Sequence, residues 1–250
     1  MENVIQRIKG NPYLAVLVAV LMGWLVILIS KGSAIPVVNV IGSFIPLNFY
    51  TKNVIFKFFM LLFSIAAILL INKGNIKNYG FAWPVHFSYL KSGFITIGIV
   101  LASLVVGNIF FKLILGHLFP TGNNTGFPEH QSIAEMILTV WIWSSICEEV
   151  LVRGLVQGFI QDIKLQYFRL SIPVIVSGLF FGSMHLSLFS AGMGLWFVCM
   201  IVFFTTTIGF LAAYYREKSG SLLASIWIHF VANIIGSLPL IIMTLFHVSK

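Results

Sequence analysis

The stretch SSICEEVLVRGLVQGF, residues 144–159, holds three ionisable side chains inside a long apolar run. Glu148 and Glu149 are adjacent carboxylates, and Arg153 follows Glu149 by four residues, about one helical turn. A charge at mid-bilayer costs about 2.5–3.5 kcal/mol on insertion scales, so charged groups within a membrane helix usually mark a functional site. The stretch therefore predicts a membrane helix with a buried charged centre.

The composition of the whole chain agrees with a membrane location. Its 250 residues are 59% hydrophobic and 9% charged, with a mean hydropathy of +1.01, whereas a soluble domain is about 25% charged. Apolar runs of this length predict an all-α, polytopic transmembrane helical bundle rather than a β-barrel. We expect a single integral membrane domain over residues 1–250, with the lipid bilayer as a partner. The net charge of +8 is explained by loops that orient the helices, so no nucleic acid is expected.

About seven spans are expected, with eight as the alternative. They cover residues 12–30, 53–72, 93–116, 132–160, 170–188, 193–215 and 221–246. Residues 31–50 contain two prolines and several turn formers, so we expect a loop with interfacial pieces there, or a re-entrant segment.

The basic residues predict the orientation of the chain. A cytoplasmic N-terminus places nine of them inside: Arg7, Lys9, Lys73, Lys77, Lys91, Lys164, Arg169, Arg216 and Lys218. Three fall outside, Lys31, Lys52 and Lys250, while Lys57, Lys112 and Arg153 lie within spans. The positive-inside rule therefore favours a cytoplasmic N-terminus and an external C-terminus.

The helix geometry separates the two carboxylates. Glu149 and Arg153 share a helix face and can form an ion pair. Glu148 points about 100° away from Glu149, so it cannot share Arg153 equally well. We expect Glu149 and Arg153 to support the site and Glu148 to be available for chemistry. The alternative is a buried network of all three that only fixes helix packing.

Two later spans add polar groups at helical spacing. The segment SGLFFGSMH, residues 177–185, places Phe181 and His185 on one face together with Gly178 and Gly182, a pair that lets another helix approach closely. The segment SIWIHFVANIIG, residues 225–236, has a small and polar stripe: Ser225, His229, Ala232, Asn233 and Gly236. A lone membrane histidine is often only an interhelical hydrogen-bonding group. Two histidines, an asparagine and a glutamate on three helices are harder to explain in that way.

These residue types together favour hydrolysis. A carboxylate can act as general base on water, and a histidine can orient that water or bind a metal. A histidine and an amide can stabilise the developing oxyanion. Other intramembrane protease signatures are missing from the sequence: it has no H-E-x-x-H, no G-x-S-x-G or G-x-S-G, and its single aspartate, Asp162, lies outside the predicted spans.

The motifs together resemble those of the CPBP family, also called the ABI family. This family comprises CAAX proteases and bacteriocin-processing enzymes related to the type II CAAX prenyl endopeptidase. The matching motifs are E-E-x-x-x-R at Glu148, Glu149 and Arg153, F-x-x-x-H at Phe181 and His185, and H-x-x-x-N at His229 and Asn233. The resemblance covers residues 144–236, and the N-terminal half matches only in being apolar and helical.

The resemblance implies an intramembrane endopeptidase acting on a peptide or on a prenylated or lipid-anchored protein. Glu148 and His185 would activate the attacking water, and His229 and Asn233 would stabilise the oxyanion. The supporting residues would be Glu149, Arg153 and Phe181.

The need for a metal is left open by these residues. The family is commonly labelled a metalloprotease, and Glu148, His185 and His229 would resemble a catalytic zinc site with an open position. The same residues also suffice for metal-free catalysis, which we favour. A transporter or channel is an alternative function, because intramembrane ionisable groups also mark ion paths. A non-catalytic bacteriocin-immunity or scaffold protein is another.

Overall fold

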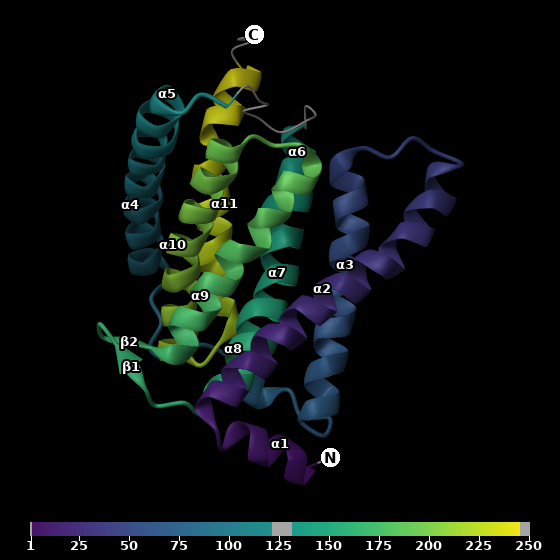
Figure 1. The fold of residues 1–250 in the computed structure, drawn as a ribbon, viewed down its shortest axis with the longest axis vertical. Helices are drawn as coiled ribbons and strands as arrows, with labels where there is room; N and C mark the ends of the chain where they lie inside the picture. Colours follow the sequence, from purple (N-terminus) through teal and green to yellow (C-terminus); the bar gives the residue numbers. More distant parts are fainter. Residues whose placement is uncertain (1, 122–131, 246–250) are drawn as a thin grey trace.

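The computed structural model describes residues 2–121 and 132–245, and these residues are almost entirely helical (Figure 1). The sheet in this part of the chain is a two-stranded antiparallel hairpin of β1 (Gln166–Tyr167) and β2 (Leu170–Ser171), with Gln166 opposite Ser171. The predicted all-α helical bundle is confirmed.

Long helices make up the bundle. They are α2 (Pro12–Gly42), α3 (Phe49–Ile71), α4 (Tyr89–Gly107), α9 (Ile172–Met184), α10 (Leu195–Ser219) and α11 (Leu222–Leu245). The shorter helices are α1 (Glu2–Lys9), η1 (Lys77–Tyr79), η2 (Asn108–Leu115), α5 (Gly116–Leu118) and η5 (His185–Ala191). A further continuous helix is built from α6 (Ile133–Met136), η3 (Ile137–Ser144), α7 (Ser145–Glu149), η4 (Val150–Val156) and α8 (Gln157–Ile160).

Six helical segments in the described part of the chain are long and apolar enough to cross a membrane. They begin at Pro12, Phe49, Tyr89, Ile172, Leu195 and Leu222. The continuous helix from α6 to α8 is not among them, and it carries the charged stretch quoted above. These segments and this helix coincide with the seven predicted spans.

The prediction of a loop over residues 31–50 is wrong for its first part. Helix α2 continues to Gly42 and passes through Pro36. A proline removes one helical hydrogen bond, but membrane helices tolerate this where neighbouring groups compensate. Pro36 was therefore a misleading signal, whereas Pro46 lies in the loop, which is confined to the residues between Gly42 and Asn48, the N-cap of α3.

The helix with the charged stretch is not a regular α-helix. Its segments η3 and η4 are π-helical, and they flank the single α-helical turn of α7 that contains Glu148 and Glu149. π-helical segments inside α-helices occur frequently at functional sites. Periodicity in the sequence did not predict this feature.

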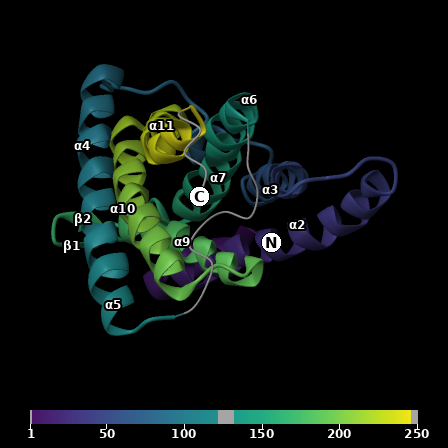
Figure 2. The same ribbon diagram turned by 90° about the horizontal axis from the view of Figure 1, so that it is seen from above.

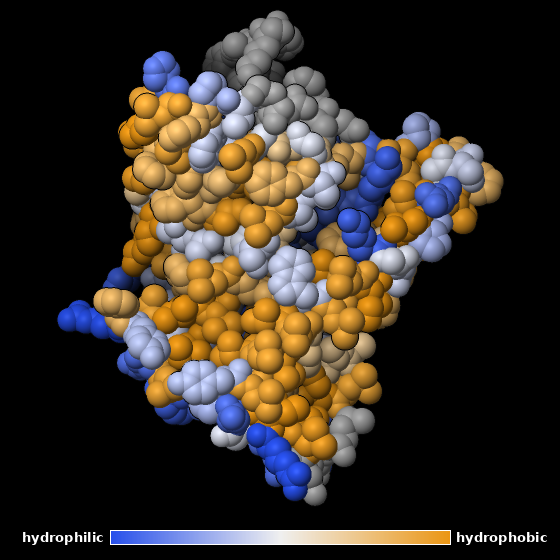
Figure 3. All heavy atoms as spheres, in the orientation of Figure 1, coloured by the Kyte–Doolittle hydropathy of each residue, from blue (hydrophilic) through white to orange (hydrophobic). Residues whose placement is uncertain are grey.

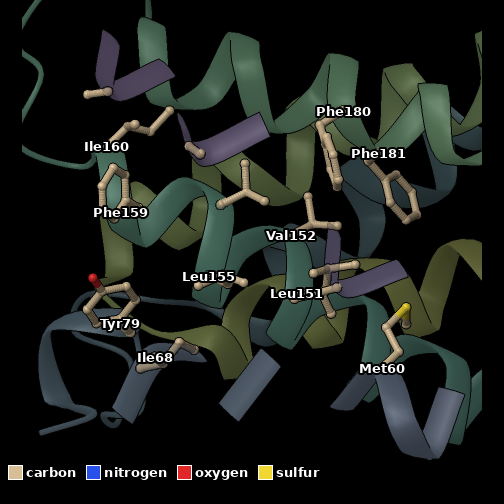
Figure 4. Packing of buried hydrophobic residues seen from close by; sticks show 14 of the residues in the cluster. Met60, Ile68, Tyr79, Leu151, Val152, Leu155, Phe159, Ile160, Phe180 and Phe181 are labelled. Carbon is tan, nitrogen blue, oxygen red and sulfur yellow. The ribbon is translucent and has the colours of Figure 1, made fainter. Parts of the chain in front are cut away.

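The hydrophobic core surrounds the second half of this helix (Figure 4). Leu151, Leu155 and Phe159 are buried there against side chains from α2 and α3 and against Tyr79. Helix α2 approaches through a stripe of buried and mostly small residues at intervals of three or four: Ala15, Ala19, Gly23, Val26, Ser30 and Ala34. Small residues permit close van der Waals packing, which holds membrane helices together in the absence of a hydrophobic driving force.

Helices α9 and α10 also pack closely through glycines. A β-carbon added at Gly178 would overlap the ring of Phe210, and one at Gly182 would overlap the hydroxyl of Thr206. The predicted close approach of another helix at this glycine pair is confirmed. It holds the end of α9, where His185 follows, against α10.

The helices α2 and α3 form an arm on one side of the bundle, with α4 on the opposite side (Figures 1 and 2). The α6–α8 helix and α11 lie between them (Figure 2). At the end where α1 lies, Lys9 is 3.8 Å from Asp162, and Arg216 donates to Gln161 at 3.2 Å. Several basic residues assigned to the inside thus meet at one end, while the orientation in the membrane stays a prediction.

Candidate active site

A cavity of about 750 Å³ lies between the α2–α3 arm and the rest of the bundle. All four predicted catalytic residues line it, namely Glu148, His185, His229 and Asn233, together with the supporting residue Phe181. In the space-filling view, hydrophilic residues gather in a hollow beside this arm, within a mostly hydrophobic surface (Figure 3). The structure thus brings together side chains from three separate helical segments.

Glu148 is nearly buried, with 8% of its surface exposed. Its Oε2 lies 3.6 Å from Nε2 of His229, longer than an ordinary hydrogen bond. Its Oε1 lies 2.6 Å from the ammonium nitrogen of Lys57 in α3. Glu148, which cannot share Arg153 equally well, therefore has a charged partner of its own from another helix.

Glu149 lies at the centre of the second charged contact. Its Oε1 accepts from Nη1 of Arg153 at 2.8 Å, as predicted from the four-residue spacing. The same oxygen lies 2.9 Å from Nδ1 of His229. Because an ionised carboxylate only accepts hydrogen bonds, Nδ1 of His229 carries a proton. Glu149 therefore orients the imidazole that faces Glu148.

Arg153 also connects two helices. It is fully buried, and its Nη2 donates to the backbone oxygen of Gly209 in α10 at 2.8 Å. One turn later, Gln157 donates to the backbone oxygen of Ala213 at 3.0 Å. These two bonds fix the register of the charged helix against α10.

Phe181 packs against both histidines. Its ring centroid lies 5.1 Å from that of His185 and 5.1 Å from that of His229, in edge-to-face arrangements. The guanidinium carbon of Arg153 lies 4.6 Å from the centre of the same ring. Phe181 thus supports the site by packing.

The backbone of Phe181 determines the tautomer of His185. Its carbonyl oxygen lies 2.9 Å from Nδ1 of His185. A carbonyl oxygen only accepts, so Nδ1 carries the proton and Nε2 of the neutral ring is an acceptor. A water molecule in the cavity could donate to this nitrogen.

Asn233 lies one turn after His229 on α11. Its Nδ2 donates to the backbone oxygen of Val140 and to Oγ of Ser145, each at 3.1 Å. The hydroxyl of Ser145 itself donates to the backbone oxygen of Trp141. An incoming acceptor could therefore replace Ser145 as the hydrogen-bond partner of Asn233.

Lys57 is the polar residue of this site that the sequence reasoning left out. It was counted only as a basic residue within a span, although a buried lysine in a membrane helix carries the same functional signal as Glu148. Its ammonium group binds Glu148 and donates to Oγ of Ser144. Nothing in the local sequence links residue 57 to residue 148, so only the fold shows the pairing.

The predicted metal ligands do not form a metal site in this arrangement. No group of three histidine, cysteine, aspartate or glutamate residues in the described part of the chain is arranged to hold a metal ion. The carboxylate of Glu148 instead binds the ammonium of Lys57, and Nδ1 of His229 binds Glu149. The ammonium at Glu148 fits hydrogen bonding better than coordination of a divalent cation, while the Nδ1 contacts of the two histidines are compatible with either.

The candidate site lies in the part of the chain that matches a known protein family. Residues 130–235 match the family model described as type II CAAX prenyl endopeptidase Rce1-like. The match confirms the resemblance to the CPBP/CAAX protease family. No curated protein and no solved structure gave a match.

The Rce1-like segment contains every site residue that the motifs predicted. Lys57 and the α2–α3 arm lie outside it. The cavity is therefore bounded on one side by the Rce1-like segment and on the other by helices that the family model does not cover.

Proposed function

We propose that this protein is an intramembrane endopeptidase that hydrolyses a peptide bond with water activated by Glu148 and His185. The observation that carries the proposal is the position of Glu148, His185, His229 and Asn233 on one cavity within a multi-pass helical bundle. Their catalytic roles are proposals, supported by the Rce1-like match.

Water activation follows from the two acceptors that face the cavity. A water molecule donates one hydrogen bond to a carboxylate oxygen of Glu148 and one to Nε2 of His185. As the water oxygen attacks the carbonyl carbon of the substrate, Glu148 takes its proton as general base. The protonated Glu148 then donates to the amide nitrogen that leaves.

Oxyanion stabilisation is assigned to His229 and Asn233. Glu149 accepts from Nδ1 of His229 and orients the ring, so that Nε2, when it also carries a proton, can donate to the oxyanion. Asn233 supplies the second donor when its bond to Ser145 is exchanged for the oxyanion. Both donors lie on α11, one turn apart, so they approach the same atom from one side.

The substrate class is inferred from the family and from the cavity walls. Rce1-like proteins are described as CAAX prenyl endopeptidases, and a prenylated CAAX tail is the substrate that we propose. Apolar side chains such as Trp24, Ile27 and Phe56 line the cavity on the side of the arm. They can solvate a lipid chain while the peptide reaches Glu148.

The test is a cleavage assay with purified protein in lipid nanodiscs. Prenylated CAAX peptides, a peptide with an N-terminal leader and a transmembrane anchor peptide are offered separately, and the products are identified by mass spectrometry. We expect the prenylated peptide to be cut, and Glu148→Gln to reduce the rate by at least about 100-fold, the usual contribution of a general base.

The same variant separates the other functions. Glutamine keeps the shape of residue 148 and can still accept from Lys57, but it leaves that lysine without a counter-ion, so the folded yield is measured beside cleavage. If Glu148→Gln cleaves at the rate of the wild type, the proposed mechanism is wrong. If the wild type cleaves none of the three peptides, the transporter or scaffold functions are favoured instead.

A further inference from the structure

Lys57 is a buried cation that the proposed chemistry has not used. It lies on α3, outside the Rce1-like segment, and 7% of its surface is exposed. The buried residues of α3 fall at intervals of three to four and form one face: Lys57, Met60, Ser64 and Ile68. The lysine therefore points from α3 into the bundle rather than into lipid.

The ammonium group of Lys57 binds two residues of the charged helix. It lies 2.6 Å from Oε1 of Glu148 and donates to Oγ of Ser144. Ser144 and Glu148 are four residues apart and share a helix face. The two contacts together hold the lysine over this face and fix the carboxylate of Glu148.

We propose that Lys57 is a positioning residue that holds the carboxylate of Glu148 in the orientation that its role as general base requires. This inference rests on the proposed function. It extends the site to a helix that the family model does not cover, and it gives the α2–α3 arm a part in the chemistry as well as in the cavity wall.

The charges around Glu148 explain why Lys57 is needed. The titratable groups that face it or lie beside it come from α3, α7, η4, η5 and α11: Lys57, Cys147, Glu149, Arg153, His185 and His229. Lys31 of α2 lines the same cavity. Arg153 is bound to Glu149, Nδ1 of His185 faces the carbonyl oxygen of Phe181, and Nε2 of His229 lies 3.6 Å from Glu148, beyond an ordinary hydrogen bond. The ammonium of Lys57 is thus the charge that binds Glu148 directly.

The two oxygens of Glu148 have different surroundings. Lys57 binds Oε1, while Oε2 faces Nε2 of His229 at a distance longer than a hydrogen bond. A lysine bound at one oxygen stabilises the negative charge of the whole carboxylate. The other oxygen is left to accept the proton of water.

A stability cycle tests the ion pair without any substrate. Removing one partner of a buried pair leaves an uncompensated charge. We therefore expect Lys57→Met to lower the thermal unfolding midpoint in nanodiscs, and the double variant with Glu148→Gln to recover most of this loss. Lys112→Met is the matched control, because Lys112 also lies in a spanning helix but is exposed and outside the cavity. Purely additive effects of the two substitutions would overturn the inference.

The split between kcat and KM tests the effect on the base. Without the lysine, neither oxygen of Glu148 is held by a cation, so the carboxylate is less well oriented towards the attacking water. We expect Lys57→Met to lower kcat towards the limit of about 10²–10⁴-fold that a general base supplies, with KM little changed.

Conservative replacement completes the test. Lys57→Arg keeps a cation that can bind Glu148 and should restore much of kcat, and Lys112→Met should leave kcat and KM unchanged. A Lys57→Met enzyme whose loss of activity only matches its loss of folded protein would show a purely structural role and overturn the inference. An unaltered kcat would also overturn it.

The two experiments distinguish failure of this inference from failure of the proposed function. If the wild type cleaves and Glu148→Gln does not, but Lys57→Met matches the wild type, only the role of Lys57 falls. If the wild type cleaves none of the peptides, the proposed function is wrong. The positioning role of Lys57 in catalysis is then wrong as well, whatever the stability cycle shows.

Discussion

His229 Nδ1 lies 2.9 Å from Oε1 of Glu149, so the last helix of the bundle is held by the second carboxylate of the central helix. The same oxygen binds Arg153 at 2.8 Å. Glu149 is thus shared between a structural cation and the imidazole that faces Glu148. Substitutions in this contact should alter folding and chemistry together.

Glu149→Gln should lower both stability and activity. The substitution leaves Arg153 buried without a counter-ion, and breaking a buried pair in this way typically costs about 3–5 kcal/mol. It also replaces the carboxylate that accepts from Nδ1 of His229 with a neutral amide. Thermal unfolding in nanodiscs measures the first effect, and kcat on a peptide that the wild type cuts measures the second. A stable but inactive variant would mean that Glu149 acts only through His229.

Arg153→Ala should reduce the amount of folded protein in the membrane. It leaves the carboxylate of Glu149 unpaired and removes the bond to the carbonyl of Gly209. Size-exclusion chromatography of detergent extracts measures the folded yield. Unchanged yield with abolished cleavage would instead assign Arg153 a direct role in binding substrate.

Asn233→Ala should mainly reduce catalysis. Loss of one oxyanion donor costs about 2.7–4 kcal/mol in transition-state stabilisation, or about 10²–10³ in kcat. The bonds to Val140 and Ser145 are lost as well, so the unfolding midpoint should be measured in parallel. Ser145→Ala is the control, because it removes one of those bonds but no oxyanion donor. A loss in the control equal to that in Asn233→Ala would argue against the donor role.

Gly182→Ala should weaken the packing of α9 on α10. The added methyl group overlaps the hydroxyl of Thr206, and overpacking typically costs about 1–3 kcal/mol. Gly98→Ala is the matched control, since a β-carbon there meets nothing within 4 Å. The unfolding midpoint should fall in the first variant and not in the second. Thr206→Ala should partly rescue Gly182→Ala.

Purified active protein should be essentially metal-free and insensitive to chelators. The carboxylate of Glu148 binds the ammonium of Lys57, a cation that already neutralises its charge. Metal analysis of the purified protein and activity before and after chelation measure this. Near-stoichiometric zinc, with activity that chelation abolishes and zinc restores, would contradict it.

Most of the fold followed from hydrophobicity and helix periodicity. Seven apolar runs predicted seven helical segments, and the spacing of Glu149 and Arg153 predicted their ion pair. The extension of α2 beyond Pro36 was missed because proline breaks a soluble helix more readily than a membrane helix. The π-helical segments were missed because their sequences carry no distinct signal.

The site was predictable where its residues belong to one helix or to a known motif. Contacts between different helices could not be predicted from the sequence. The pairing of Lys57 with Glu148 depends on how α3 packs against α7, and that packing arises from many small contacts rather than from any local pattern. His229 could be placed near a carboxylate from its motif, but which of the two adjacent carboxylates holds its Nδ1 needed the fold.

The α2–α3 arm has a consequence for how related enzymes could diverge. It forms one wall of the cavity but lies outside the Rce1-like segment. A lineage could remodel this arm and acquire a new peptide preference while the reacting groups of the other helices stayed intact. Lys57 limits that freedom, because the arm also supplies the ammonium bound to Glu148. A chimera that receives a foreign arm should therefore need a cation at the position of Lys57 before any new selectivity can be expressed.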